Sequence, residues 1–187
     1  MYLEKLTDEY FMLPHTRRHD NMLSAVDASL IDFRKSGSCL LSRESVSLAH
    51  YGSDRSMSEY CDLRLINLDD VKDTEDFKTN VMNDLYAVEP DIMLFTTNGF
   101  MENITETRAA GCPNLIIEVW SKSNGPFHRQ KKFDLYKTGS NTEHWYMEQD
   151  SNVVHCFMGM DRLKDQNLKS VLVTAFGIEI DLTYLAL

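Results

Sequence analysis

The sequence lacks the motifs of several common chemistries, and each absence narrows the range of functions. Its four cysteines form no CxxC pair and its six histidines form no HExxH motif, so zinc-knuckle, thioredoxin-like and zinc-protease chemistry is not indicated. No apolar run approaches the roughly 18 residues of a membrane span, and the first residues lack the apolar core of a signal peptide. We therefore expect a cytoplasmic protein with reduced, buried thiols and no contact with the membrane.

Positive charge is also scarce. The chain has 19 Lys and Arg against 29 Asp and Glu, a formal net charge of −10, which excludes general coating of nucleic acid. The charge is uneven, however. Residues 62–106 hold 11 acids and 3 bases, a net of −8, whereas residues 122–137 hold five bases and one acid, a net of +4. An enzyme that contacts phosphate at one cationic place is therefore not excluded.

The length of 187 residues favours one domain over residues 1–187, since domains average about 150 residues. Its core is expected over about 19–158, with a C-terminal segment, 170–187, packing on it. Hydrophobic periodicity predicts helices over 3–12, 18–35 and 126–138. Strands are expected at 45–51, 61–66, 86–95, 115–120, 144–147 and 153–157, the last two as a hairpin. This order indicates an α/β or α+β domain with a mixed sheet flanked by helices.

Two carboxylates stand where strands are expected. Asp91 follows Pro90 and immediately precedes an apolar run, and Glu118 lies inside the apolar run 115–120. A carboxylate in a buried strand is costly unless it is paired or bound to a metal. Both are therefore candidate functional residues. The plainer alternatives are a turn residue at a strand start for Asp91 and an outward-facing position for Glu118.

A cationic helix follows the second carboxylate after a short polar break. His128, Lys132 and Tyr136 are spaced i, i+4 and i+8, so they share one helical face. We expect this helix to face phosphate, with His128, Arg129, Lys131 and Tyr136 as substrate-binding candidates. The alternative is an ordinary solvated face, which is how most charge runs on helices are used.

Two strand carboxylates with a lysine nearby form a known chemical arrangement. Carboxylate oxygens suit a hard divalent cation such as Mg²⁺ or Mn²⁺. Such a cation lowers the pKa of a bound water and neutralises charge on a phosphate. The lysine would orient the water or stabilise the transition state. The pattern therefore favours metal-assisted phosphodiester hydrolysis.

Four segments follow one another along the chain in an order and spacing typical of a known family: Val88–Ile92, Pro113–Ser121, Lys132–Tyr136 and Glu143–Trp145. Together they resemble the Uma-type putative restriction endonucleases, a family of the PD-(D/E)XK nuclease superfamily. The C-terminal Phe176–Leu182 and the helix from His19 to Leu30 are similar as well. The likeness covers most of residues 19–185, and residues 88–146 are its specific part.

The resemblance implies an αβββαβ core and metal-dependent cleavage of DNA. It makes Asp91 and Glu118 metal ligands, with the Val119 backbone carbonyl as a possible third. It also makes Lys132 the catalytic lysine. In the simplest superfamily pattern the lysine lies two residues after the glutamate, where this chain has Trp120, so here the helix supplies it. Because many such nucleases cut as dimers, a homodimer is expected.

The chain departs from the family pattern in three places. His128 replaces the usual acid four residues before the lysine, and Asn114 stands where an aspartate is common. No hairpin carrying a glutamate is expected before the first helix, and Asp20 or Asp27 would have to replace that acid. These departures leave open a second function, an inactive nuclease-like domain that binds DNA or a protein partner. A zinc hydrolase is a third reading, but histidines such as His155 more often have structural roles.

Overall fold

The computed structural model describes residues 2–5, 10–13, 17–31, 39–43, 47–49, 87–88, 90–96, 108–110, 113–121, 124–137 and 141–186. Side chains are described for 17–31, 90–95, 113–121, 124–137 and 141–186. Within these residues, no helix has the length and apolar character needed to cross a membrane.

The centre of the molecule is a seven-stranded mixed sheet with the order β11-β10-β9-β8-β6-β3, and β12 pairs with β10 off this path. The two middle strands, β8 and β9, are parallel. The pairs β3–β6, β6–β8 and β9–β10 are antiparallel. The strands are β3 (Cys39–Arg43), β6 (Ile92–Thr96), β8 (Leu115–Trp120), β9 (Glu143–Glu148), β10 (Val153–Met158), β11 (Asp161–Arg162) and β12 (Gln166–Asn167).

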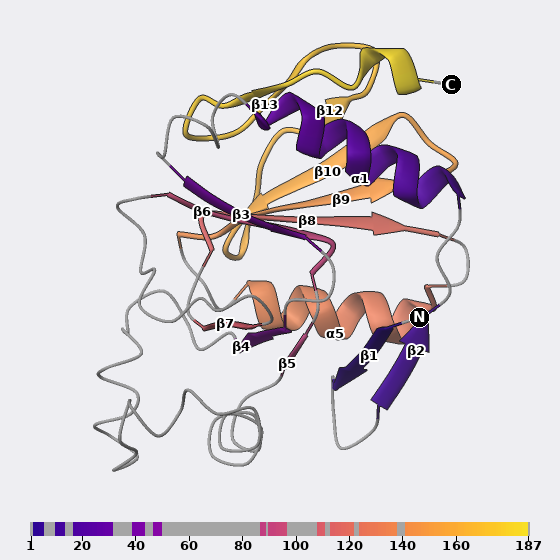
Figure 1. Ribbon diagram of the computed structural model, residues 1–187, viewed down its shortest axis with the longest axis vertical. Coiled ribbons are helices and arrows are strands. Elements are labelled where there is room, and N and C mark those ends of the chain that lie inside the picture. The colour runs from indigo at the N-terminus through magenta and orange to yellow at the C-terminus, as the bar shows by residue number, and fades with distance from the viewer. Residues whose placement is uncertain are drawn as a thin grey trace.

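Two helices cover opposite faces of this sheet, as Figure 1 shows. They are α1 (Arg17–Ser29) and α5 (Pro126–Tyr136). The order α1, β3, β6, β8, α5, β9 along the chain is the αβββαβ core that the resemblance implied. The expectation of a mixed sheet flanked by helices is confirmed, as is the hairpin of β9 and β10.

Alternation along the strands sends side chains to two separate cores. On the α1 face, Leu115 and Ile117 of β8 pack with Met22, Leu23 and Val26 of α1. The other core lies on the α5 face and consists of Met93, Phe95, Ile116, Tyr136 and Tyr146, with Trp120 and Phe133 packed against it. Because side chains on a strand alternate, Glu118 shares the α5 face with Ile116 and Trp120.

The N-terminal segment differs from its prediction. The expected helix over residues 3–12 is wrong, because β1 (Tyr2–Lys5) and β2 (Tyr10–Leu13) form an antiparallel hairpin. Both segments contain aromatic and large apolar residues, which favour strands once a partner strand is available. The expectation that no hairpin precedes the first helix is therefore also wrong, and Glu4 lies on β1 opposite Phe11.

This hairpin belongs to a second sheet, ordered β2-β1-β5-β4-β7. Its other strands are β5 (Ala87–Val88), β4 (Ser47–Ala49) and β7 (Arg108–Ala110). The predicted strand 45–51 is thus present in part, and β7 is a strand that the sequence analysis did not predict. The predicted strand 61–66 and most of the acidic segment 62–106 lie outside the described residues.

The C-terminal segment packs on the α1 face, next to α1 in Figure 1. It contains a small sheet of β13 (Leu172–Val173) and β14 (Glu179–Ile180), followed by the 3-10 helix η3 (Thr183–Leu185). Leu172, Ile178, Ile180 and Leu182 join the same core as α1. The apolar alternation of residues 176–182 therefore buries one edge of the segment, as the sequence predicts.

Candidate active site

Glu118 lies on the α5 face of the sheet and is 2% exposed. Both of its carboxylate oxygens accept hydrogen bonds from the ammonium of Lys132, each with an N–O distance of 2.9 Å. The hydroxyl of Tyr136 donates to Glu118 Oε1 over 2.6 Å. Since Lys132 is only 3% exposed, this is a buried ion pair reinforced by a phenol. The alternative of an outward-facing Glu118 is excluded.

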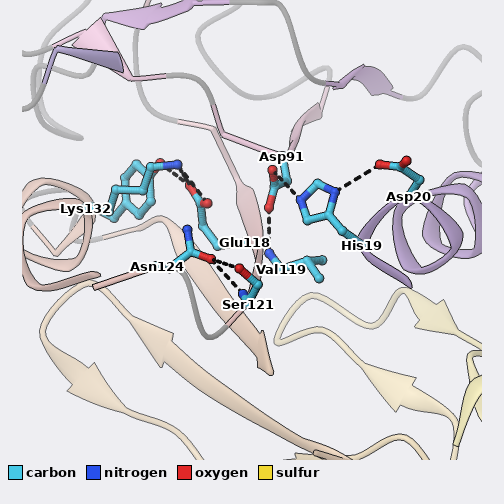
Figure 2. A network of polar contacts seen from close by, with 9 residues as sticks. His19, Asp20, Asp91, Glu118, Val119, Ser121, Asn124 and Lys132 are labelled. Atoms are coloured by element: carbon cyan, nitrogen blue, oxygen red, sulfur yellow. Dashed lines mark hydrogen bonds and ion pairs between the residues drawn. The ribbon is translucent and has the colours of Figure 1, made fainter. Parts of the chain in front are cut away.

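A short loop sets the position of Lys132 relative to Glu118. The side-chain oxygen of Asn124 accepts hydrogen bonds from the Ser121 backbone N–H over 2.7 Å and from its hydroxyl over 3.0 Å (Figure 2). Gly125 and Pro126 then begin α5, with proline at a first-turn position where its missing N–H costs nothing. The polar residues that break the strand pattern thus turn the chain back over β8.

Arg129 fastens this loop to the sheet. Its guanidinium donates to the backbone carbonyls of Asn124 and Ser121, both over 2.8 Å, and forms an ion pair with Glu148. It also lies over the ring of Trp120, with 4.8 Å from Cζ to the ring centroid. Because these contacts join the end of β8 to the start of α5, Arg129 helps to hold Lys132 above Glu118.

Asp91 lies at the point where β6 begins. The paired register of β6 and β8 ends at Ile92 opposite Ile117. Beyond it, the backbone N–H of Val119 donates to Asp91 Oδ2 over 2.6 Å. The carboxylate therefore replaces a strand partner at the edge of the ladder. Asp91 is 8% exposed, so its position is fixed by a buried contact.

A histidine that the sequence analysis assigned only to the first helix completes the contacts of Asp91. His19 Nε2 lies 3.1 Å from Asp91 Oδ1, and its Nδ1 lies 3.3 Å from Asp20 Oδ1. Of the two acids proposed to replace the family glutamate, Asp20 is therefore the one linked to Asp91. A sequence signal was present, because His19 continues the apolar stripe of Met22, Val26 and Leu30 and is itself buried.

The two candidate carboxylates are neighbours in the sheet but have different partners. Extending the β6–β8 register by one residue places Asp91 directly opposite Glu118. Figure 2 shows Glu118 turned toward Lys132 and Asp91 turned toward His19. One carboxylate thus contacts α5 and the other contacts α1. The structure thus brings Asp91, Glu118 and Lys132, the three residues that the sequence analysis named, to one end of the sheet.

The donors present suit a hard cation. Carboxylates of Asp91 and Glu118 with a backbone carbonyl at Val119 form an all-oxygen set of the kind that Mg²⁺ prefers. Within the described residues, no group of three or more His, Cys, Asp or Glu side chains is arranged to hold a metal ion. Mg²⁺ does not require such a group, because it usually takes one or two carboxylates and keeps several waters. The types of donor atom are thus those of a hard cation and not of a zinc centre, while the structure turns Asp91 toward His19 and Glu118 toward Lys132.

The remaining helix candidates divide between two faces of α5. His128, Lys132 and Tyr136 form its buried face, so the prediction that they share one face is confirmed. Lys131 lies on the other side, with its Nζ 5.5 Å from the centroid of the Phe127 ring. Phe127 is 54% exposed, which places this pair at the surface. Lys122 lies outside the described residues.

Beside Glu118, two further polar side chains are held in their neutral forms. Tyr146 stands opposite Glu118 in the parallel ladder, and burial, followed by the charge of Glu118, raises the pKa of its phenol well above the usual range. His144 Nδ1 lies 2.9 Å from the Tyr146 hydroxyl and its Nε2 lies 2.8 Å from the Gly159 carbonyl. Burial lowers the pKa of His144 to about 4. Neither group is therefore charged near neutral pH.

The other cysteine and histidine predictions agree with structural roles where they are described. Cys156 is buried, and burial raises the pKa of its thiol to about 11. His155 Nδ1 lies 3.0 Å from Asp165 Oδ2, which makes it a hydrogen-bonded strand residue. Cys61 and Cys112 lie outside the described residues. The described side chains of Cys156 and His155 thus do not suggest thiol or zinc chemistry.

Comparison with known proteins identifies the class of protein to which the chain belongs. A solved structure described as a putative nuclease belonging to DUF820 from Anabaena variabilis ATCC 29413 matches 99% of this chain and 91% of its own, with a TM-score of 0.58 and 12% sequence identity. At that identity the likeness shows a shared nuclease-like fold. Residues 63–182 match the model of the Uma2 family, described as "Putative restriction endonuclease". The chain belongs to this family, and the resemblance noted from its sequence is confirmed.

None of the curated proteins compared with the chain matches it. Membership of the Uma2 family nevertheless supports a nuclease at the level of the general class. The roles of single residues rest on the geometry of the site.

Proposed function

We propose that this protein is a metal-dependent DNA endonuclease that hydrolyses phosphodiester bonds at the Asp91–Glu118 end of the sheet. The observation that carries the proposal is the buried Glu118, held by Lys132 and Tyr136 and set opposite Asp91 in the register. A buried charge pair is expensive to build and seldom needed for stability. Its place beside a second oriented carboxylate, in a family of nucleases, supports a catalytic use.

Asp91 and Glu118, with the Val119 carbonyl, would hold Mg²⁺ or Mn²⁺. When bound, the ion would supply a water of lowered pKa and neutralise charge on the phosphate. The chain's own groups act around it. The Val119 N–H and His19 keep the Asp91 carboxylate in one orientation. Lys132 donates hydrogen bonds to both oxygens of Glu118 and places an ammonium where it can orient the attacking water or stabilise the developing negative charge.

The other candidates on α5 would have separate roles, and Lys131 is the one that would bind the DNA backbone. Lys131, at the surface beside Phe127, would contact a phosphate. Tyr136 would keep Glu118 in place, and His128 would line the same buried face. Arg129 would act by holding the loop that begins α5, in keeping with its contacts to Ser121 and Asn124.

Cleavage of supercoiled plasmid DNA in Mg²⁺ or Mn²⁺ tests the site. Asp91→Asn and Glu118→Gln keep size and remove charge, and each is expected to lower the cleavage rate at least about 100-fold. Asp161→Asn, at an exposed position on β11, is the matched control and should cut at the wild-type rate. Circular dichroism and melting curves establish that the variants are folded. If folded Asp91→Asn cuts as fast as the wild type, the site assignment fails.

One observation favours a second function, an inactive nuclease-like domain that binds DNA or a protein partner. Both oxygens of Glu118 already accept hydrogen bonds from Lys132, so a cation would have to compete with an internal ammonium. Under this alternative Mg²⁺ does not raise the melting temperature, whether the domain binds DNA or a protein partner. Under the nuclease proposal Mg²⁺ raises it, and Asp91→Asn abolishes the rise.

We propose a homodimer as the cutting unit, because two copies related by a two-fold axis place two sites on the two strands of a duplex. Sedimentation velocity with and without a DNA duplex checks this. A monomer that cuts both strands at unchanged rates on dilution would contradict it.

A further inference from the structure

A pocket of about 430 Å³ lies beside α5 on the same face of the sheet as Glu118. One wall comes from a single stripe of the helix, in which Pro126, Arg129, Gln130 and Phe133 follow helical spacing. Ligand pockets span roughly 300 to 1,000 Å³, so the space suits a small planar group with its attached sugar. The pocket is distinct from the buried face of α5, which covers Glu118.

The floor of the pocket is aromatic and comes from three neighbouring strands. Trp120 ends β8, Tyr146 lies on β9 and Phe157 lies on β10. The Trp120 and Tyr146 ring centroids are 4.2 Å apart, and those of Tyr146 and Phe157 are 5.8 Å apart. Tyr146 is also the residue opposite Glu118 in the β8–β9 ladder. Adjacent strands lie roughly 4.8 Å apart, so the pocket begins one strand away from the candidate site.

Cationic groups stand over this aromatic floor. Arg162, whose side chain is 60% exposed, lies with Cζ 5.9 Å from the Phe157 ring centroid. Its contacts with Asp165 and His155 both use Nη2. A guanidinium carries five N–H donors, so donors remain to reach an anion at the rim. The pocket therefore combines aromatic rings inside with two guanidinium groups at its rim, Arg129 over Trp120 and Arg162 over Phe157, each of which also pairs with a carboxylate.

We propose that this pocket binds one unpaired base of the nucleic-acid substrate, next to the phosphodiester that is cut. The proposal rests on the nuclease function proposed above and names a subsite for it. Aromatic faces stack any base, and a cation at the edge of the stack contacts the phosphate on the same strand, which is how single strands are bound without sequence preference. A base in a duplex must leave its stack to enter such a pocket.

Binding is measured in EDTA, so that no cutting occurs, by fluorescence anisotropy of an end-labelled ten-nucleotide oligo(dT). The comparison probe has the same ten phosphates and no bases. A base pocket predicts that the abasic probe binds roughly 5- to 150-fold more weakly, as expected for loss of one base–aromatic stack. Thymidine monophosphate as competitor distinguishes a strand subsite from a free-nucleotide site, because it should displace the oligomer only at far higher concentration.

Variants locate the stack. Trp120→Leu should weaken oligo(dT) binding by the same factor while leaving the abasic probe unaffected, and Trp120→Phe, which keeps an aromatic face, should stay within about threefold of the wild type. Tyr184→Ala removes an exposed aromatic ring from η3, outside the pocket, and should change nothing. Arg162→Gln should weaken binding more than Lys169→Gln, which removes an equal charge from an exposed position elsewhere.

Three results would overturn the proposal: equal binding of the two probes, no effect of Trp120→Leu, or equal effects of the two charge variants. If Trp120→Leu instead dissociates a dimer in sedimentation velocity without changing oligonucleotide affinity, the aromatic surface is a protein interface. Plasmid cleavage distinguishes failure of the pocket proposal from failure of the nuclease proposal. Base-dependent binding without any metal-dependent cutting would refute the nuclease and retain the pocket, whereas cutting that depends on Asp91 with base-independent binding would do the reverse.

Discussion

The two faces of the central sheet are built from different kinds of residue. The α1 face buries aliphatic side chains of α1, the strands and the C-terminal segment, and its polar contact between His19 and Asp91 lies at the end of the sheet. The α5 face instead buries a charged pair, Glu118 and Lys132, among aromatic rings. Apolar packing would have stabilised this face equally well or better. The comparison supports a division in which the α1 face mainly maintains the fold, whereas under the nuclease proposal the Glu118–Lys132 pair of the α5 face takes part in the chemistry with Asp91 at the edge of the α1 face.

The largest effect is expected from breaking the charge pair. Lys132→Met keeps the length of the side chain but leaves the Glu118 carboxylate buried without its cation. We expect a loss of about 3 to 5 kcal/mol in the free energy of unfolding, measured by urea denaturation. The double variant Glu118→Gln/Lys132→Met removes both charges and should lose clearly less than the single variant. A loss below about 1 kcal/mol for Lys132→Met would show that the pair is hydrated.

On the opposite face, an apolar truncation should cost stability and leave the chemistry intact. Leu23→Ala creates a cavity in the α1 core, where Leu23 is fully buried, and should cost about 2 to 5 kcal/mol by the same measurement. Ser24→Ala, at the exposed neighbouring position, should cost little. Under the nuclease proposal, the Mg²⁺-induced rise in melting temperature persists in Leu23→Ala. Its disappearance would mean that the two faces are not separable.

The sequence predicted those parts of the fold and of the candidate site that depend on residues close together along the chain. The strand 115–120 and the helix that begins at Pro126 were predicted because apolar runs and turn residues are local signals. Glu118 stood out because a charge inside such a run demands a partner. The spacing of Lys132 and Tyr136 placed both on one face, and the structure turns that face toward Glu118.

What the sequence did not predict depends on partners far away along the chain. The N-terminal hairpin was taken for a helix although β1 pairs locally with β2; β1 joins the rest of its sheet through β5, more than 80 residues later. The contact of His19 with Asp91 joins residues 72 positions apart. The aromatic pocket likewise requires Trp120, Tyr146 and Phe157 to stand side by side, which is set by strand order and not by local spacing.

Acid should lower the free energy of unfolding through His144, which is buried on the α5 face. Its pKa is about 4 in the folded chain against an ordinary value of 6.5. The unfolded chain therefore binds an extra proton between these values, and stability that is complete above pH 6.5 is lost as the pH falls toward 4. The shift corresponds to at most about 3 kcal/mol. Chemical denaturation at several pH values should show this loss.

His144→Gln provides the comparison for the acid effect, because glutamine does not titrate. Its unfolding free energy should fall less between pH 6.5 and 4 than that of the wild type. Glu143, whose pKa is raised by burial, opposes the effect, since its folded form retains a proton that the unfolded form releases. Both proteins carry Glu143, so its contribution cancels in the difference. Equal slopes for the two proteins would mean that His144 is not the group that titrates.

The smallest effect is expected one turn farther along the same helix. Lys137 forms an ion pair with Asp134, and their side chains are 33% and 41% exposed, respectively. Lys137→Met is the same substitution as Lys132→Met, made on a pair that water already screens, so it should cost less than about 1 kcal/mol in urea denaturation. Added salt should reduce even this difference, whereas the Lys132→Met loss should persist because a buried pair is poorly screened. Similar costs for the two substitutions would show that burial is not what distinguishes Glu118 and Lys132 from an ordinary surface pair.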